Sequence, residues 1–100
     1  SGITLLDNTA VAAPVFTYPA ASYPFAVIEY SVSRNGNFRV GRLLLTNDAT
    51  AASSSDDFVN TASTGITLTT DISAGNVRVL YTSTNTGFNG TFKYSMRKWS

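Results

Sequence analysis

The segment from Phe25 to Asn47 constrains the fold most, because it holds two long β-type runs joined by Asn35-Gly36. A type I′ turn needs a positive φ angle at both central residues, and Asn and Gly adopt such angles with the least strain. The sequence therefore predicts a two-residue β-hairpin in which Arg34 faces Asn37.

This turn also fixes the register of the two strands, because each step back along one strand matches a step forward along the other. It predicts Glu29 opposite Arg42, as an opposite-charge pair. It also places Tyr30 opposite Gly41, where the tyrosine ring can cover the bare glycine backbone. We interpret both pairs as determinants of register and packing, not as parts of a binding site.

Strand-like segments recur along the whole chain at short, even intervals, with turn residues between them and no convincing helical period. The stretch from Ala49 to Ser55 lacks apolar residues that could anchor a helix, so we expect a flexible loop there. The last two strands alternate between apolar and polar residues, and we expect them to form a hairpin across Ser83 to Gly90. The expected strands are Ile3–Leu6, Val15–Tyr18, Phe25–Ser33, Asn37–Thr46, Asp57–Thr61, Ile66–Thr70, Val77–Thr82 and Thr91–Trp99.

About eight short antiparallel strands are typical of a β-sandwich or barrel. We therefore expect residues 1–100 to form a single all-β domain, an antiparallel, jelly-roll-like β-sandwich. No run of the sequence approaches 18 apolar residues, so we expect no membrane insertion. The chain does not begin with methionine, and we expect it to be a piece of a longer protein.

Two apolar runs, at residues 25–28 (FAVI) and 43–45 (LLL), do not alternate as a strand with one solvated face should. Something is expected to cover their outer face, either a second subunit or an internal loop of the same chain. Phe25, Val27 and Leu44 are therefore candidate subunit-interface residues. Trp99 is a fourth, because a terminal tryptophan more often caps a sandwich or fills an interface than contacts a ligand.

The chain has no histidine and no cysteine, which excludes Ser-His-Asp and Cys-His catalysis and histidine- or thiolate-bound zinc. We expect a protein that is not an enzyme and holds no cofactor and no metal. Two alternatives stay open, a catalytic carboxylate pair and a calcium site at Asp48, Asp56 and Asp57. Against both, we expect Glu29 to be tied to Arg42 and the aspartates of the middle segment, including Asp71, to lie in or beside turns.

The net charge is only +1, but the charges are unevenly placed. Between residues 43 and 75 all of them are acidic, and after residue 75 all of them are basic. The four late bases are too few for a nucleic-acid interface, so no nucleic acid is expected. The asymmetry is interpreted as attraction between neighbouring strands or subunits, with a merely solvated surface as the alternative.

The loop from Ser83 to Gly90 (STNTGFNG) places one aromatic ring among small polar residues, which suits contact with a sugar or a protein surface. Phe88, Asn89 and Asn85 are therefore the receptor-binding candidates. The alternative is that Phe88 folds back onto the core.

Three segments in combination resemble a C-terminal β-domain of tail fibres and related structural proteins of tailed bacteriophages. They are VIEYSVSRNGNFRVGRL at Val27–Leu43, VRVLYTST at Val77–Thr84 and FKYSMRKW at Phe92–Trp99. The resemblance covers roughly residues 25 to 99 and contains no active-site signature.

This resemblance implies the C-terminal part of a longer, homotrimeric tail fibre, located at the fibre tip of the virion. Such a domain would serve trimerisation and attachment to a glycan or outer-membrane protein of the host bacterium. Two other classes stay open. A capsid or virion decoration domain would oligomerise without binding host cells, and a carbohydrate-binding module would be monomeric with a row of exposed aromatic residues.

Overall fold

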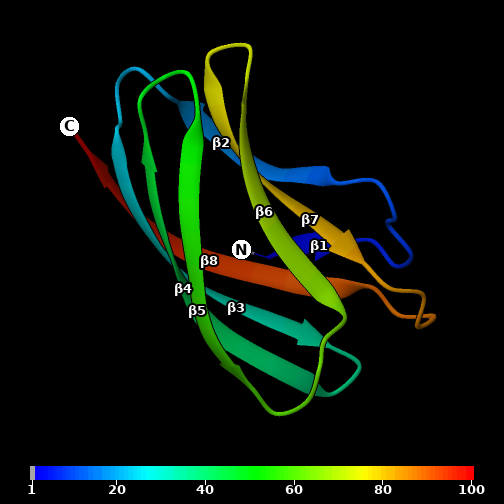
Figure 1. The fold of residues 1–100 in the computed structure, drawn as a ribbon. Helices are drawn as coiled ribbons and strands as arrows, with labels where there is room; N and C mark the ends of the chain where they lie inside the picture. The colour runs from blue at the N-terminus through cyan, green and yellow to red at the C-terminus, as the bar shows by residue number, and fades with distance from the viewer. Residues whose placement is uncertain (1) are drawn as a thin grey trace.

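The computed structural model describes residues 2–100, which form eight antiparallel strands in two stacked sheets, as the sequence predicts (Figure 1). Within these residues no helix is long and apolar enough to cross a membrane. The strands are β1 (Ile3–Leu5), β2 (Ala13–Pro19), β3 (Phe25–Arg34), β4 (Asn37–Asn47), β5 (Ala52–Asn60), β6 (Ile66–Ser73), β7 (Asn76–Ser83) and β8 (Gly90–Trp99).

The five-stranded sheet has the order β1-β8-β3-β4-β5, and the three-stranded sheet has the order β2-β7-β6. The first strand thus pairs with the last, and the second with the seventh. This nested pairing is typical of a jelly-roll-like sandwich. The predicted fold class is confirmed.

The β3–β4 hairpin has the predicted turn and register. Asn35 and Gly36 both have positive φ angles, of 49° and 79°. Tyr30 lies opposite Gly41, and a Cβ atom added to Gly41 would lie only 2.8 Å from Cζ of Tyr30, so the ring does cover this glycine. Glu29 and Arg42 also face each other, although they form no ion pair within residues 2–100.

The predicted loop at Ala49–Ser55 is wrong in its second half, because β5 begins at Ala52. Serines 53 to 55 pair along β4 through the main chain, which requires no apolar side chains at an edge strand. The expected turn positions are also wrong for three of the four aspartates. Asp56 and Asp57 lie within β5 and Asp71 within β6, and only Asp48 lies in a turn, where its Oδ1 atom accepts the N–H groups of Thr50 and Ala51.

The predicted hairpin between the last two strands is also wrong. β7 already has β2 and β6 as neighbours, and β8 lies between β1 and β3 in the other sheet. Their apolar faces meet across the core instead, since Val77, Val79 and Phe92 are fully buried in one cluster. The connection between Ser83 and Gly90 therefore crosses from one sheet to the other.

The core lies between the sheets, where the Phe92 ring stacks on Tyr30 with centroids 5.3 Å apart. Alternation predicts one apolar face on β7, with Val77, Val79 and Tyr81, and all three are buried. On β8 it predicts a core face of Phe92, Tyr94 and Met96, of which Phe92 is buried and Tyr94 is 39% exposed. The largest fully buried side chains are those of Phe92, Leu5, Ile28, Leu43, Val32, Val77 and Val79.

Candidate functional site

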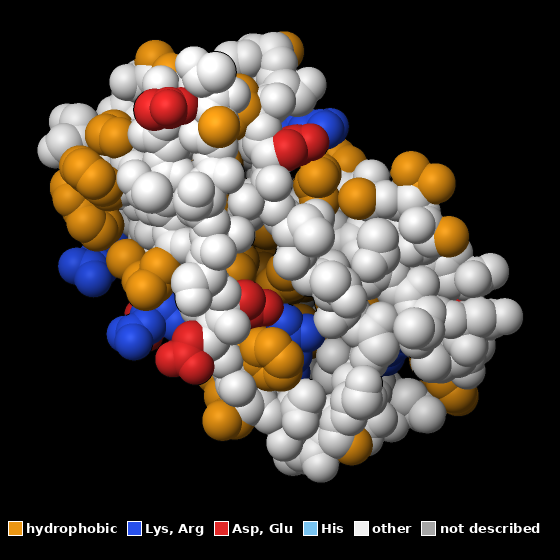
Figure 2. All heavy atoms as spheres, in the orientation of Figure 1, with side chains coloured by type: hydrophobic (Ala, Val, Ile, Leu, Met, Phe, Trp, Pro, Cys, Tyr) orange, Lys and Arg blue, Asp and Glu red, His pale blue; other side chains and the backbone are white. Residues whose placement is uncertain are grey.

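The outer face of the five-stranded sheet is arranged in three bands that run across the strands. Two apolar patches lie on either side of a charged row, and Figure 2 shows hydrophobic side chains on the left edge of the molecule, next to acidic and basic ones. By strand register, the first patch is Trp99, Phe25, Val27 and Leu44, the charged row is Glu29, Arg42 and Asp57, and the second patch is Phe38, Val40 and Val59.

The first patch brings together all four predicted interface residues. Trp99 on β8 is opposite Phe25 on β3, and Val27 is opposite Leu44 on β4. The Phe25 and Trp99 rings lie 6.0 Å apart at an interplanar angle of 33°. The register of three strands therefore builds one continuous apolar surface.

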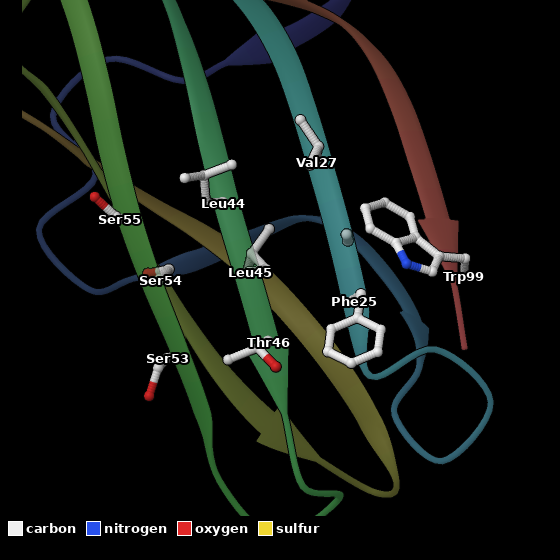
Figure 3. Close-up of a pocket in the computed structure, with 10 residues that line it drawn as sticks. Phe25, Val27, Leu44, Leu45, Thr46, Ser53, Ser54, Ser55 and Trp99 are labelled. Carbon is white, nitrogen blue, oxygen red and sulfur yellow. The ribbon is translucent and has the colours of Figure 1, made fainter.

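These residues line a groove of about 430 Å³. Figure 3 shows the aromatic rings of Phe25 and Trp99 on one side of it and the small side chains of Ser53 and Ser55, on β5, on the other. Small polar residues along one wall leave room for another backbone to approach closely. We call this surface, made of Phe25, Val27, Leu44, Trp99 and the β5 serines, the outer groove.

Nothing in residues 2–100 covers the outer groove. Phe25 keeps 45% of its surface exposed, Leu44 46% and Trp99 44%. The alternative of an internal loop folded over these strands is therefore wrong. The apolar outer face that the sequence indicates is open in the single chain.

The predicted receptor-binding residues lie at the opposite end of the sandwich. There the β1–β2, β3–β4, β5–β6 and β7–β8 connections gather, on the right and lower side of Figure 1, away from the C-terminus. Phe88 is half-exposed and is not part of the core cluster, which contradicts the alternative that it folds back. Asn85 is exposed, whereas Oδ1 of Asn89 accepts the backbone N–H of Asp7 at 2.9 Å.

Asp7 holds the β7–β8 loop in place. Its carboxylate accepts the backbone N–H groups of Thr86 and Gly87, at 2.9 and 3.0 Å, and a guanidinium N–H of Arg34. The Thr86 N–H is the largest cause that lowers the pKa of Asp7. Because the folded-state pKa is the lower one, the stabilisation exists above the ordinary aspartate pKa and is lost as the pH falls through the lowered value.

Arg34 is buried beside this loop, only 3% exposed. Its Nε atom donates to the carbonyl of Phe88, its Nη1 to that of Thr64, and its Nη2 both to that of Thr84 and to Asp7. One side chain thus connects β3 to three other segments of the chain. The Phe88 loop is held at both Asp7 and Arg34, which makes it a pre-ordered surface.

A second buried arginine, Arg39, connects the two sheets. It donates to Asp56 on β5, to the hydroxyl of Tyr30 and to the carbonyl of Ile66 on β6, and its guanidinium lies 3.8 Å from the centroid of the Phe58 ring. Burial raises the pKa of Tyr30, and the hydrogen bond from its hydroxyl to Asp56 raises it further. The sequence analysis did not predict that Arg34 and Arg39 are buried, although both occupy positions whose side chains point toward the core.

The acidic residues of the described chain form no group of metal-ligand type. Within residues 2–100 no three His, Cys, Asp or Glu side chains cluster in a way that could hold a metal ion. Asp56 is paired with Arg39, and Asp71 with Arg78 across β6 and β7. The second pair is an instance of the predicted attraction between acidic and basic strands.

Two comparisons with known proteins add no relative: no protein-family model matches the sequence, and no curated protein matches it.

Proposed function

We propose that this domain is a non-enzymatic, C-terminal trimerisation and attachment domain of a tailed-bacteriophage tail fibre, located at the fibre tip. The observation that carries the proposal is the uncovered outer groove, in which four apolar side chains from three strands lie together at the surface. The resemblance of the sequence to tail-fibre β-domains supports the same reading. The host-surface partner would be a glycan or an outer-membrane protein.

The energetics of the outer groove favour a second copy of the chain as its occupant. Contiguous apolar surface on a small domain usually marks an interaction site. Completing the burial of Phe25, Leu44 and Trp99 contributes about 1 kcal/mol for each side chain. Every subunit of a homotrimer presents the same groove, so these contributions recur at each contact.

The charged row next to the groove supports a partner that carries the same residues. Glu29, Arg42 and Asp57 form no ion pairs within residues 2–100. Covering them costs free energy unless opposite charges meet them. A second copy of the chain carries the same row and so supplies both positive and negative charges.

The loop end supports attachment. Phe88 is exposed on a loop that Asp7 and Arg34 hold in one conformation, so little ordering entropy opposes binding there. The loop lies at the far end of the sheet from the outer groove. Assembly through the groove therefore leaves the loop free to contact a host surface.

A monomeric carbohydrate-binding module is the second candidate. The adjacent, partly exposed rings of Phe25 and Trp99 favour it, because such rings can stack on a sugar. In that case the outer groove would be a ligand site and the chain would stay single in solution.

The mass of the domain in solution separates these two candidates. Light scattering coupled to size exclusion should give about three times the chain mass of 10.7 kDa at micromolar concentration. A monomer at that concentration would contradict the fibre proposal and favour the module.

Phe88→Ala should weaken adsorption of the domain to host cells without lowering its melting temperature, because the ring is exposed and contributes little to the core. Adsorption is measured with fluorescently labelled domain on a panel of bacterial strains, and stability by circular dichroism. Val11→Ala, at another exposed apolar residue, is the control and should change neither. Unchanged adsorption of Phe88→Ala would remove Phe88 from the attachment surface.

A further inference from the structure

A small polar pocket of about 190 Å³ lies at the loop end, between the β3–β4 turn, the β5–β6 connection and the β7–β8 loop. Its walls include Asn35, Asn37, Thr64, Thr86 and the buried Arg34. We propose that this pocket binds an uncharged sugar residue. The inference deepens the attachment function and rests on it, because it names the ligand chemistry of the attachment end.

Two side chains of the pocket have unused hydrogen-bonding groups. Within residues 2–100 the side-chain amides of Asn35, which is exposed, and Asn37, which is partly buried, form no hydrogen bond to another protein group. Each amide offers two donors and one acceptor oxygen. Neighbouring sugar hydroxyls, which both donate and accept, match such groups.

Arg34 holds the walls of the pocket together. A guanidinium has five N–H groups, and four of those of Arg34 have acceptors within residues 2–100. The fifth belongs to Nη1, and this nitrogen lies 3.2 Å from where a Cβ atom on Gly65, another lining residue, would stand. The buried guanidinium therefore packs against Gly65 and fixes the position of this part of the pocket wall.

The charge of the site favours a neutral ligand. Arg34 is the only charged residue that lines the pocket, and Asp7 balances it through their ion pair. A carboxylate or phosphate would therefore meet no net positive charge. A neutral sugar hydroxyl needs no counter-charge in such a pocket.

Hydrogen bonds connect the pocket to the loop that carries Phe88. Arg34 donates to the Phe88 carbonyl at 2.9 Å, and Thr86, two residues earlier on the same loop, lines the pocket. The contact is through the Phe88 backbone, and the lining of the pocket itself is polar. A few converging polar groups fix the orientation of a small ligand.

The test is a titration of the ¹⁵N-labelled domain with the methyl glycosides of glucose, galactose, mannose and N-acetylglucosamine at millimolar concentrations. At least one of them should shift the side-chain signals of Asn35, Asn37 and Arg34 in nuclear magnetic resonance spectra. Asn37→Ala should weaken this binding about tenfold, because it removes the groups that bind one hydroxyl. Asn60→Ala, on exposed β5 outside the pocket, is the matched control and should leave binding unchanged.

Asn35→Gly provides a second variant, because glycine keeps the positive φ angle of the turn while the amide is removed. It should also weaken binding. The proposal is overturned if no glycoside in the panel shifts the pocket signals, if both pocket variants bind as tightly as the control, or if inorganic phosphate shifts the pocket signals more than the sugars do. Cell adsorption tests attachment separately, so the pocket and the attachment function can fail independently.

Discussion

Replacing Arg34 with methionine should lower the free energy of unfolding by about 3–5 kcal/mol, the usual cost of removing one partner from a buried ion pair. Methionine fills much of the volume but donates no hydrogen bond. The carbonyls of Thr64, Thr84 and Phe88 would each lose a donor, and Asp7 would lose its counter-charge. Because a domain of this size is stable by only about 5–15 kcal/mol, the variant should lose a large fraction of its stability.

The chain contains a matched control in Arg78→Met. Arg78 also forms a two-point ion pair, with Asp71 at 2.8 and 2.6 Å, but their side chains are 33% and 41% exposed. Its loss should lower stability far less than the loss of Arg34, because solvent screens the pair. Urea unfolding followed by circular dichroism at one fixed protein concentration measures both variants, and equal losses would contradict the buried role of Arg34.

Arg34→Lys keeps the charge and separates its contribution from that of the hydrogen bonds. A lysine ammonium has three donors at one point and cannot reach acceptors on three different segments. Its loss of stability should therefore lie between those of Arg34→Met and Arg78→Met.

The burial of Arg34 and Arg39 could have been predicted from the alternation of inward and outward side chains along their strands. Once Tyr30 and Gly41 are placed opposite each other on the inward side, alternation along β3 and β4 brings Arg34 and Arg39 to the same side. Residue type argued against that position, since arginine is almost never fully buried unless paired. The pairing partners come from segments far away in the sequence, and no local pattern indicates them.

The β3–β4 hairpin was predictable because its determinants are local: a turn dipeptide and two alternating runs. The β6–β7 hairpin was harder to predict, because its turn uses Ala74-Gly75 with positive φ angles of 51° and 79°, and alanine rarely occupies that region. The assignment of β7 and β8 to different sheets depends on which faces meet across the core. Alternation in each strand indicates an inward face but not the sheet to which the strand belongs.

In the candidate site too, some features were predictable from local sequence and others were not. Phe25, Val27 and Leu44 were predicted from runs that break alternation, and Trp99 from its place at the end of the chain. Strand register then gathers all four on one surface. The polar pocket was not predicted, because Arg34, Thr64 and Thr86 are 22 or more residues apart and lie together only through three loops.

Replacing Leu44 with aspartate should convert the proposed trimer into monomers. The side chain lies near the centre of the outer groove, so an interface there would bury an unpaired carboxylate, at a cost of several kcal/mol for each contact. The protein concentration at which half of the chains are assembled should then rise by about 100-fold or more.

The fold itself should tolerate this substitution, because Leu44 is 46% exposed on the outer face of the single chain. Val11→Asp makes the same change of charge at an apolar residue that is 83% exposed and belongs to no strand, and it should leave the mass unchanged. Light scattering over a dilution series measures assembly, and circular dichroism checks that both variants are folded. A folded Leu44→Asp domain that keeps the trimer mass would show that the subunits meet elsewhere, because no tight apolar contact could accept three buried carboxylates at the outer groove.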